Sequence, residues 1–131
     1  MTVTHINPES LHRNPAFSQA TLVFHEPGES GRTLYIGEQN GTDASGAISG
    51  DFAAQTRQAF SNLLAILHEV GADQSSVAKL TIYFKVGESV REGFAASGDV
   101  WGMHPTAITV IPVPELGRPE ALVGIEAIAS V

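Results

Sequence analysis

The clearest pattern in the chain lies between residues 51 and 72, where apolar side chains recur at the three- and four-residue spacing of one helix face. The apolar positions of this stretch are Phe52, Phe60, Leu63, Leu64, Leu67 and Val70. Asp51 is a favourable N-cap residue and Gly71 a favourable C′ residue, so both ends are marked. The pattern predicts a helix of about twenty residues whose apolar face packs on another element.

Shorter segments have the composition of β-strands, and residues 77–85 show it most clearly because apolar and polar residues alternate there. Its two expected faces are Leu80, Ile82 and Phe84 against Thr81, Tyr83 and Lys85. The remaining strand segments are residues 19–24, 32–37, 106–113 and 121–131. The first two are separated by the turn-rich residues 25–31, so we expect them to form a hairpin. Glycine-rich residues 38–50 are expected to be loop.

A weaker helix is predicted over residues 88–102, where Gly93 and Gly98 interrupt the pattern. The element order is therefore β-β-α-β-α-β-β, and an α+β fold with both helices on one face of the sheet is the economical solution. Pleating puts Ile108 and Val110 under the helices.

The opposite face of the sheet has an unusual composition. It would carry Thr81, Tyr83, Thr109 and Glu126 among small apolar residues such as Ala107 and Ile111. That mixture is too apolar for open water and too polar for a core, and a symmetric subunit interface would explain it.

Length and charge narrow the possible functions. The chain has 131 residues, which suits a single domain spanning residues 1–131. Its net charge is −7 and its basic residues are scattered, so we expect no nucleic-acid partner. We find no apolar run of membrane-spanning length and no signal-peptide pattern, so we expect neither membrane insertion nor export. The absence of cysteine agrees with a cytoplasmic protein.

Motifs for metal, cofactor or serine chemistry are lacking in the sequence. The histidines form no HxH or HExxH pair, so no metal site is expected. No G-x-S-x-G elbow occurs, and the loop at residues 41–50 lacks the GK[ST] ending of a phosphate loop, so no cofactor is expected. Glu126 lies in the middle of the last strand. It is a candidate general base, a partner for an arginine across an interface, or a solvent-exposed edge residue.

Taken together, these segments resemble the RidA/YjgF/UK114 family, also described as L-PSP endoribonuclease-like. The resemblance rests on "FSQA", "LYIGEQNG", "DFAAQTRQAFSNLLAILHEVGA", "VAKLTIYF", "HP" before "TAITVIPV", and "VGIEAIA", and it runs from about Asn14 to Ala129. It implies a chorismate-mutase-like α+β fold and a homotrimeric barrel with small-molecule clefts between subunits. The best-known members of this family hydrolyse reactive enamines and imines to a keto acid and ammonia.

The family's reactive positions are only partly kept in this sequence. Members clamp the substrate carboxylate with the arginine of a Pro-x-Arg-x-Cys/Thr segment, and the resemblance puts that arginine at Ala107 and the Cys/Thr at Thr109. The glutamate that positions water is the first of a Glu-x-Glu pair. Its place is taken by Gly124, while Glu126 matches the second glutamate.

Further cleft positions are matched as follows. The family's Ser-Gly-Gln falls on Gly37, Glu38 and Gln39, and its cleft tyrosine falls on Phe17. Its cleft asparagine in the second helix region aligns with Val90 or Arg91. The expected ligand-binding residues are Phe17, Gly37, Gln39, Arg91, Ala107 and Thr109, and the catalytic candidates are Glu126, Glu38 and Thr109. Glu38 can replace the missing glutamate only if it turns inward.

The missing arginine changes the expected substrate. A charge-assisted hydrogen bond contributes about 1.5–3 kcal/mol, so small anionic imino acids should bind poorly without it. One hypothesis is a divergent imine or enamine deaminase, or a related hydrolase, acting on a neutral or less carboxylate-like substrate. The alternative is a non-catalytic trimer that binds a metabolite or regulates a partner. RNA cleavage is disfavoured by the negative charge and by the missing histidine pair.

Overall fold

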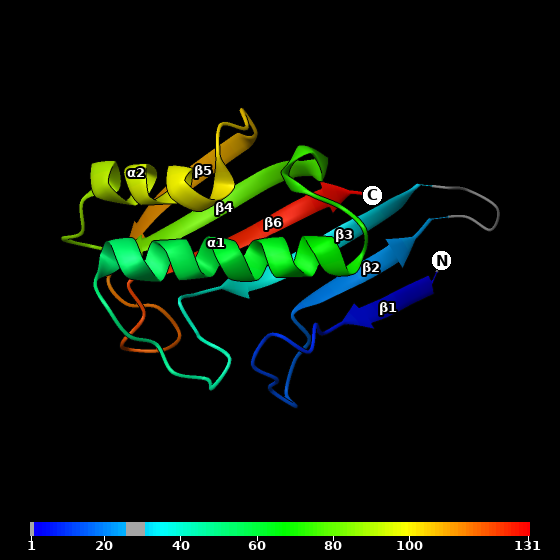
Figure 1. Cartoon of the computed structure of the whole chain (residues 1–131), viewed down its shortest axis with the longest axis horizontal. Helices are drawn as coiled ribbons and strands as arrows, with labels where there is room; N and C mark the ends of the chain where they lie inside the picture. Colours follow the sequence, from blue (N-terminus) through cyan, green and yellow to red (C-terminus); the bar gives the residue numbers. More distant parts are fainter. Residues whose placement is uncertain (1, 26–30) are drawn as a thin grey trace.

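The computed structural model describes residues 2–25 and 31–131, in which two α-helices pack on a sheet of six strands (Figure 1). The strands are β1 (Thr2–Ile6), β2 (Ala20–Phe24), β3 (Arg32–Gln39), β4 (Val77–Lys85), β5 (Ala107–Val113) and β6 (Val123–Ser130). The helices are α1 (Phe52–Glu69), the short 3-10 helix η1 (Gln74–Ser76) and α2 (Val90–Trp101). The structure confirms the predicted element order from β2 onward, but the prediction did not include β1.

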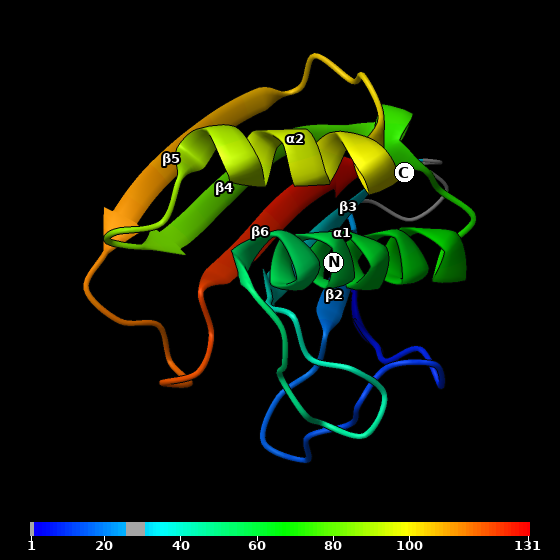
Figure 2. The same cartoon turned by 60° about the vertical axis from the view of Figure 1, so that its left-hand side comes forward.

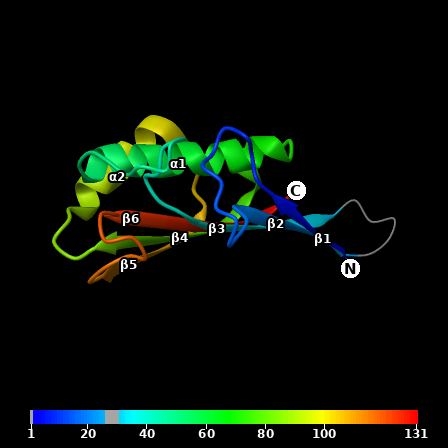
Figure 3. The same cartoon turned by 90° about the horizontal axis from the view of Figure 1, so that it is seen from below.

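The six strands form one sheet in the order β1-β2-β3-β6-β4-β5. All neighbouring pairs are antiparallel except β4 and β5, which are parallel and connected through α2. Both helices lie on the same face of the sheet, as expected (Figure 3). The predicted hairpin is also confirmed, because β2 and β3 pair with Leu22 opposite Leu34. Most of its predicted turn, residues 26–30, lies outside the described residues.

Helix α1 has the ends that the sequence predicts. The Asp51 side chain accepts a 2.9 Å hydrogen bond from the backbone N–H of Ala54, and Gly71 has the positive φ of 74° that favours glycine after a helix. Its predicted face packs on the sheet, with Phe52, Phe60, Leu63 and Leu67 buried. These side chains hold α1 over the central strands.

The core lies between α1 and the central strands, and β4 and β6 contribute alternate residues to it. Leu80 and Phe84 of β4 are buried, and Ile125 of β6 is fully buried. Thr81, Tyr83 and Glu126 point to the opposite side and are half-buried. We call that side the helix-free face. It bears the residues that the alternation predicted for it.

Three expectations need correction. β1 was missed because four of its five residues are exposed, so it lacks the alternation that marks a half-buried strand. Glu38 and Gln39 were expected in a loop, but β3 continues to Gln39 through a shift in its pairing with β6. Ile108 and Val110 lie on the helix side of β5 as expected, yet α2 leaves them 44% and 43% exposed.

Within residues 2–25 and 31–131, no helix is long and apolar enough to cross a membrane.

Candidate functional site

A carboxylate and a phenol meet on the helix-free face. The Tyr83 hydroxyl on β4 donates a 2.9 Å hydrogen bond to Glu126 Oε1 on the neighbouring strand β6. This hydrogen bond is the main cause of a raised Tyr83 pKa, followed by partial burial and by the charges of Glu126 and Glu38. The phenol therefore stays protonated at neutral pH and holds the Glu126 carboxylate in place. Because β6 lies between β3 and β4, Glu126 is not the edge residue that one of the alternatives made it, and its partner within the chain is the Tyr83 phenol.

Glu38 supplies a second carboxylate on the same face. Its side chain lies over Gly124, where a Cβ atom would be 2.5 Å from Glu38 Cδ and 2.7 Å from Cγ. Only glycine at position 124 leaves this space free. Glu38 is exposed as a residue, but partial burial of its carboxyl, and then the charge of Glu126, raise its pKa above the ordinary 4.5. Glu38 thus turns onto the sheet face, which was the condition set for it as a candidate.

Lys79 provides a cation that sequence reasoning missed. It pairs in register with Ala107 across the parallel strands β4 and β5, and its Nζ lies 2.5 Å from Thr109 Oγ1. The signal was present, because Lys79 shares the period-two face of Thr81 and Tyr83. The candidates Ala107 and Thr109 therefore lie beside an ammonium group.

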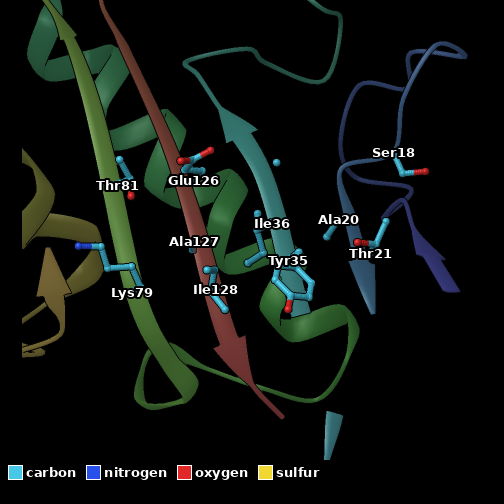
Figure 4. A pocket seen from close by; sticks show the side chains of 11 residues that line it. Ser18, Ala20, Thr21, Tyr35, Ile36, Lys79, Thr81, Glu126, Ala127 and Ile128 are labelled. Carbon is cyan, nitrogen blue, oxygen red and sulfur yellow. The ribbon is translucent and has the colours of Figure 1, made fainter. Parts of the chain in front are cut away.

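A hollow of about 370 Å³ lies on the helix-free face. Lys79 and Glu126 line it, whereas Glu38, Ala107 and Thr109 do not. Figure 4 shows Lys79 and Thr81 on β4, Glu126 on β6 and Tyr35 on β3 around it. Gly37 also lines this hollow. Its lining mixes apolar residues with the hydroxyl residues Ser18, Thr21 and Thr81.

A second hollow of about 300 Å³ lies at the end of β3 and contains Phe17, Glu38 and Gln39. Gln39 is buried, and its amide Nε2 donates to Gln19 Oε1 at 2.9 Å and to the Gly37 carbonyl at 3.0 Å. Phe17 is 59% exposed, so its ring is available for contact at the rim. Gln39 acts here as a structural support for the strand end that carries Glu38.

One chain does not bring all candidate residues together. Gly124, which lies under Glu38, pairs with Tyr83, whereas Ala107 pairs with Lys79, four residues earlier on β4. Four residues of strand correspond to about 13 Å. Arg91 is exposed near the start of α2, on the helix side of the sheet, and lines none of the hollows described for this part of the chain. Within one chain the candidates thus form two separate groups. We call Glu38, Tyr83 and Glu126 the Glu38 half-site, and Lys79, Ala107 and Thr109 the Lys79 half-site.

No group of three histidine, aspartate or glutamate side chains suited to a metal ion occurs in the described residues, and the sequence has no cysteine. The chemistry available to these half-sites is that of carboxylates, a phenol, a hydroxyl and an ammonium group. Carboxylates near water and a polarisable substrate can act as general acids and bases.

Comparison with known proteins gives consistent matches. The family model described as Endoribonuclease L-PSP matches residues 13–131. A RutC family protein of Pyrococcus abyssi is 30% identical over 82 residues, which is 63% of this chain and 64% of that protein. A Thermotoga maritima structure described as a putative endoribonuclease is 23% identical, with a TM-score of 0.84 and coverage of 100% and 98% of the two chains. A Rid-family structure from Yersinia pestis is 25% identical, with a TM-score of 0.78 and coverage of 99% and 100%.

Proposed function

Because the chain belongs to the Endoribonuclease L-PSP family, the RidA/YjgF/UK114 family of the resemblance above, we propose that it is a homotrimeric hydrolase of small imines or enamines. Family membership supports a function related to small molecules. The carboxylates on the helix-free face point to hydrolysis as the reaction. The proposed products are a carbonyl compound and ammonia.

The proposed trimer follows from the incomplete helix-free face. Tyr35 and Ile128 on that face are 46% and 40% exposed in the single chain, and Ile111 is 37% exposed. Apolar side chains of this size, mixed with fixed polar groups, are typical of surfaces that another subunit covers. A second copy could bring its Glu38 half-site opposite the Lys79 half-site of the first copy, which one chain cannot do.

The position of Glu38 over Gly124 is the observation that carries the proposed reaction. By the resemblance, the family's water-positioning glutamate falls on Gly124 and a family glycine falls on Glu38. Glycine and glutamate have thus exchanged places between two neighbouring strands, and the carboxylate still occupies the space beside β6. The loss at Gly124 therefore does not remove the carboxylate from the proposed site.

In the proposed reaction, Glu38 takes a proton from water while the water oxygen bonds to the imine carbon. The imine nitrogen takes up that proton, and a carbinolamine forms. Its hydroxyl proton then passes to the nitrogen through Glu38, the C–N bond breaks, and the carbonyl compound and ammonia leave. A carboxyl whose pKa lies above its ordinary value is a better base once ionised, which suits this task near neutral pH. Tyr83 and Glu126 provide a fixed polar wall beside it.

Lys79 and Thr109 are the proposed polar contacts for the other end of the substrate. An ammonium group is a point charge without the planar fork of arginine, so it recognises a carboxylate with less geometric selectivity. We therefore assign to this protein neutral or weakly anionic imines rather than imino acids that depend on a bidentate clamp.

An ammonia-release assay tests the proposed function. Imines are generated freshly in the presence of the protein, and one neutral imine, one enamine and one 2-imino acid are compared with their spontaneous hydrolysis. We expect faster release from at least one of them, and a loss of about a hundredfold or more in Glu38→Gln. A protein that accelerates none of them would contradict the hydrolase, and binding without turnover would then support the metabolite-binding alternative.

A further inference from the structure

An arginine that sequence reasoning did not single out lies in the same hollow as the proposed base. The hollow of about 300 Å³ at the end of β3 is lined by Arg118 as well as by Glu38 and Phe17. Arg118 belongs to the loop between β5 and β6. Glu38 and Arg118 are the charged members of this lining, so the hollow pairs a carboxylate with a guanidinium in one chain.

Three loops meet around this hollow. They are the loops between β1 and β2, between β3 and α1, and between β5 and β6, and Figure 2 shows them at the same end of the sheet. The buried Asn62 of α1 holds the second loop, because its Nδ2 donates to the carbonyls of Asn40 at 3.1 Å and Thr42 at 2.8 Å. These hydrogen bonds fix one wall of the hollow.

The Arg118 guanidinium is held in place by the same loops. Its Nη1 donates a 2.7 Å hydrogen bond to the carbonyl of Gly46, whose backbone packs so closely on His12 that a Cβ would lie 2.7 Å from the ring. Its Nε donates a 2.9 Å hydrogen bond to Glu120 Oε1, and Nη2 donates to the same oxygen. A guanidinium has five N–H donors, so the hydrogen bonds within the described residues leave two of them for a ligand.

Glu120 balances the charge of Arg118. Both side chains of this ion pair are partly exposed, and such a pair contributes little to stability. Its electrostatic consequence is larger, because one positive charge on Arg118 now stands against two negative charges on Glu120 and the ionised Glu38. An anion would gain little from the paired guanidinium and would be repelled by Glu38, whereas a neutral oxygen acceptor escapes that repulsion.

We propose that Arg118 is a specificity-determining residue that donates a hydrogen bond to a neutral carbonyl oxygen of the substrate while Glu38 acts on the imine carbon. The substrate class is an imine next to an uncharged carbonyl group, such as the imine of a 2-oxo amide. This assignment rests on the proposed function, because it names the group that the imine carries. Lys79 belongs to the other half-site, whereas Arg118 shares its hollow with Glu38 within one chain.

Binding of product-like compounds tests this contact without turnover. Pyruvamide and pyruvate share a 2-oxo group, and only pyruvate is charged. In ¹H–¹⁵N NMR titrations of the full chain, pyruvamide should shift the backbone N–H signals of Gln39 and Asn40, which line the hollow, and should bind more tightly than pyruvate. Arg118→Met should weaken pyruvamide binding about tenfold, because it removes a charge-assisted donor. Arg91→Met is the matched control, since Arg91 is exposed and lies outside the hollow.

Glu120→Gln tests the charge balance. It keeps an oxygen acceptor beside Arg118 but leaves the guanidinium charge unbalanced, so pyruvate should gain affinity relative to pyruvamide. The proposal is overturned if pyruvamide does not bind at the hollow, if the wild type prefers pyruvate, or if Arg118→Met binds pyruvamide like Arg91→Met. Should Arg118→Met fail to fold, an unchanged preference in Glu120→Gln overturns it.

The outcome is separable from that of the proposed function. Binding of pyruvamide that depends on Arg118, without any ammonia release, would contradict the hydrolase alone. Ammonia release together with pyruvamide binding that does not depend on Arg118 would contradict this assignment alone.

Discussion

The two faces of the sheet are built by alternate residues of the same strands, yet they differ in how far one chain completes them. On the helix-covered face, Leu80 and Ile125 are fully buried by α1 and the neighbouring strands. On the helix-free face, Tyr83 and Glu126 form a fixed polar pair beside exposed Ile128. The chain's own helices cover the core residues of the first face, whereas the second leaves its polar pair and apolar side chains uncovered by any helix. We therefore propose that the first face mainly provides stability and the second provides the function.

The largest expected effect comes from a substitution in the core of the helix-covered face. Ile125 and Ile128 lie on the same strand but on opposite faces, with 0% and 40% exposure. Ile125→Ala should lower the free energy of unfolding by about 2–5 kcal/mol, because it opens a cavity in the core. Ile128→Ala should cost the chain itself less than half of that and should weaken self-association. Urea unfolding measures the stability of both variants, and sedimentation measures their self-association. Equal losses of stability in the two variants would contradict the difference between the two faces.

The next effect tests the close approach of Glu38 to Gly124. Gly124→Ala puts a methyl group where Glu38 lies, so the flexible glutamate must move away. We expect ammonia release to fall about tenfold, with a melting temperature that changes little, because only a positioned base is lost. Gly117→Ala serves as the control, since no atom lies within 4 Å of its Cβ position. Unchanged ammonia release in Gly124→Ala would show that the carboxylate position is not needed.

A smaller effect concerns the cation of the helix-free face. Lys79→Met should weaken the binding of pyruvate, a small anionic keto acid, by roughly fivefold, because it removes the charge beside Ala107 and Thr109. Lys85→Met is the matched control, with the same change of charge on the same strand and at a position that does not line the hollow. NMR titration measures both, and equal weakening in the two variants would assign the effect to net charge alone.

The smallest effect is a pH dependence of stability. The Glu38 pKa is raised in the folded chain by partial burial and by Glu126, so between its unfolded value near 4.5 and its folded value the native state binds more protons. The contribution of Glu38 to stability therefore falls as the pH rises through that window. Glu38→Gln lacks this loss, so its stability relative to the wild type should be higher at pH 7 than at pH 4. Urea unfolding at both pH values checks it, and the opposite trend would contradict the raised pKa.

The helix-covered face could be predicted from the sequence in detail. The spacing of Phe60, Leu63 and Leu67 and the caps of α1 are local signals, and β4 alternates so strictly that its bounds were predicted correctly. β1 gave no such signal because it buries almost nothing. The resemblance supplied the candidate positions, but those on different strands could not be related to each other without the pairing of the strands.

The relation between Glu38 and Gly124 shows this limit most clearly. It depends on the shift in the β3–β6 register after Ile36, which joins residues far apart in the sequence and has no local pattern. The same holds for Lys79, whose position beside Ala107 follows from the parallel pairing of β4 and β5. Sequence reasoning identified Gly124 and Ala107 as losses. Only the strand pairing shows that each has a charged neighbour on the adjacent strand.

A double-mutant cycle on the exchanged pair tests the central claim, that Glu38 supplies the carboxylate missing at Gly124. Ammonia release and trimer mass are measured for Glu38→Gly, Gly124→Glu and the two changes combined. We predict that each single change lowers the rate at least tenfold and that the combined variant recovers most of it, because the carboxylate returns from the neighbouring strand. If the combined variant folds as a trimer and its losses simply add, the two positions do not share one role and the account is wrong.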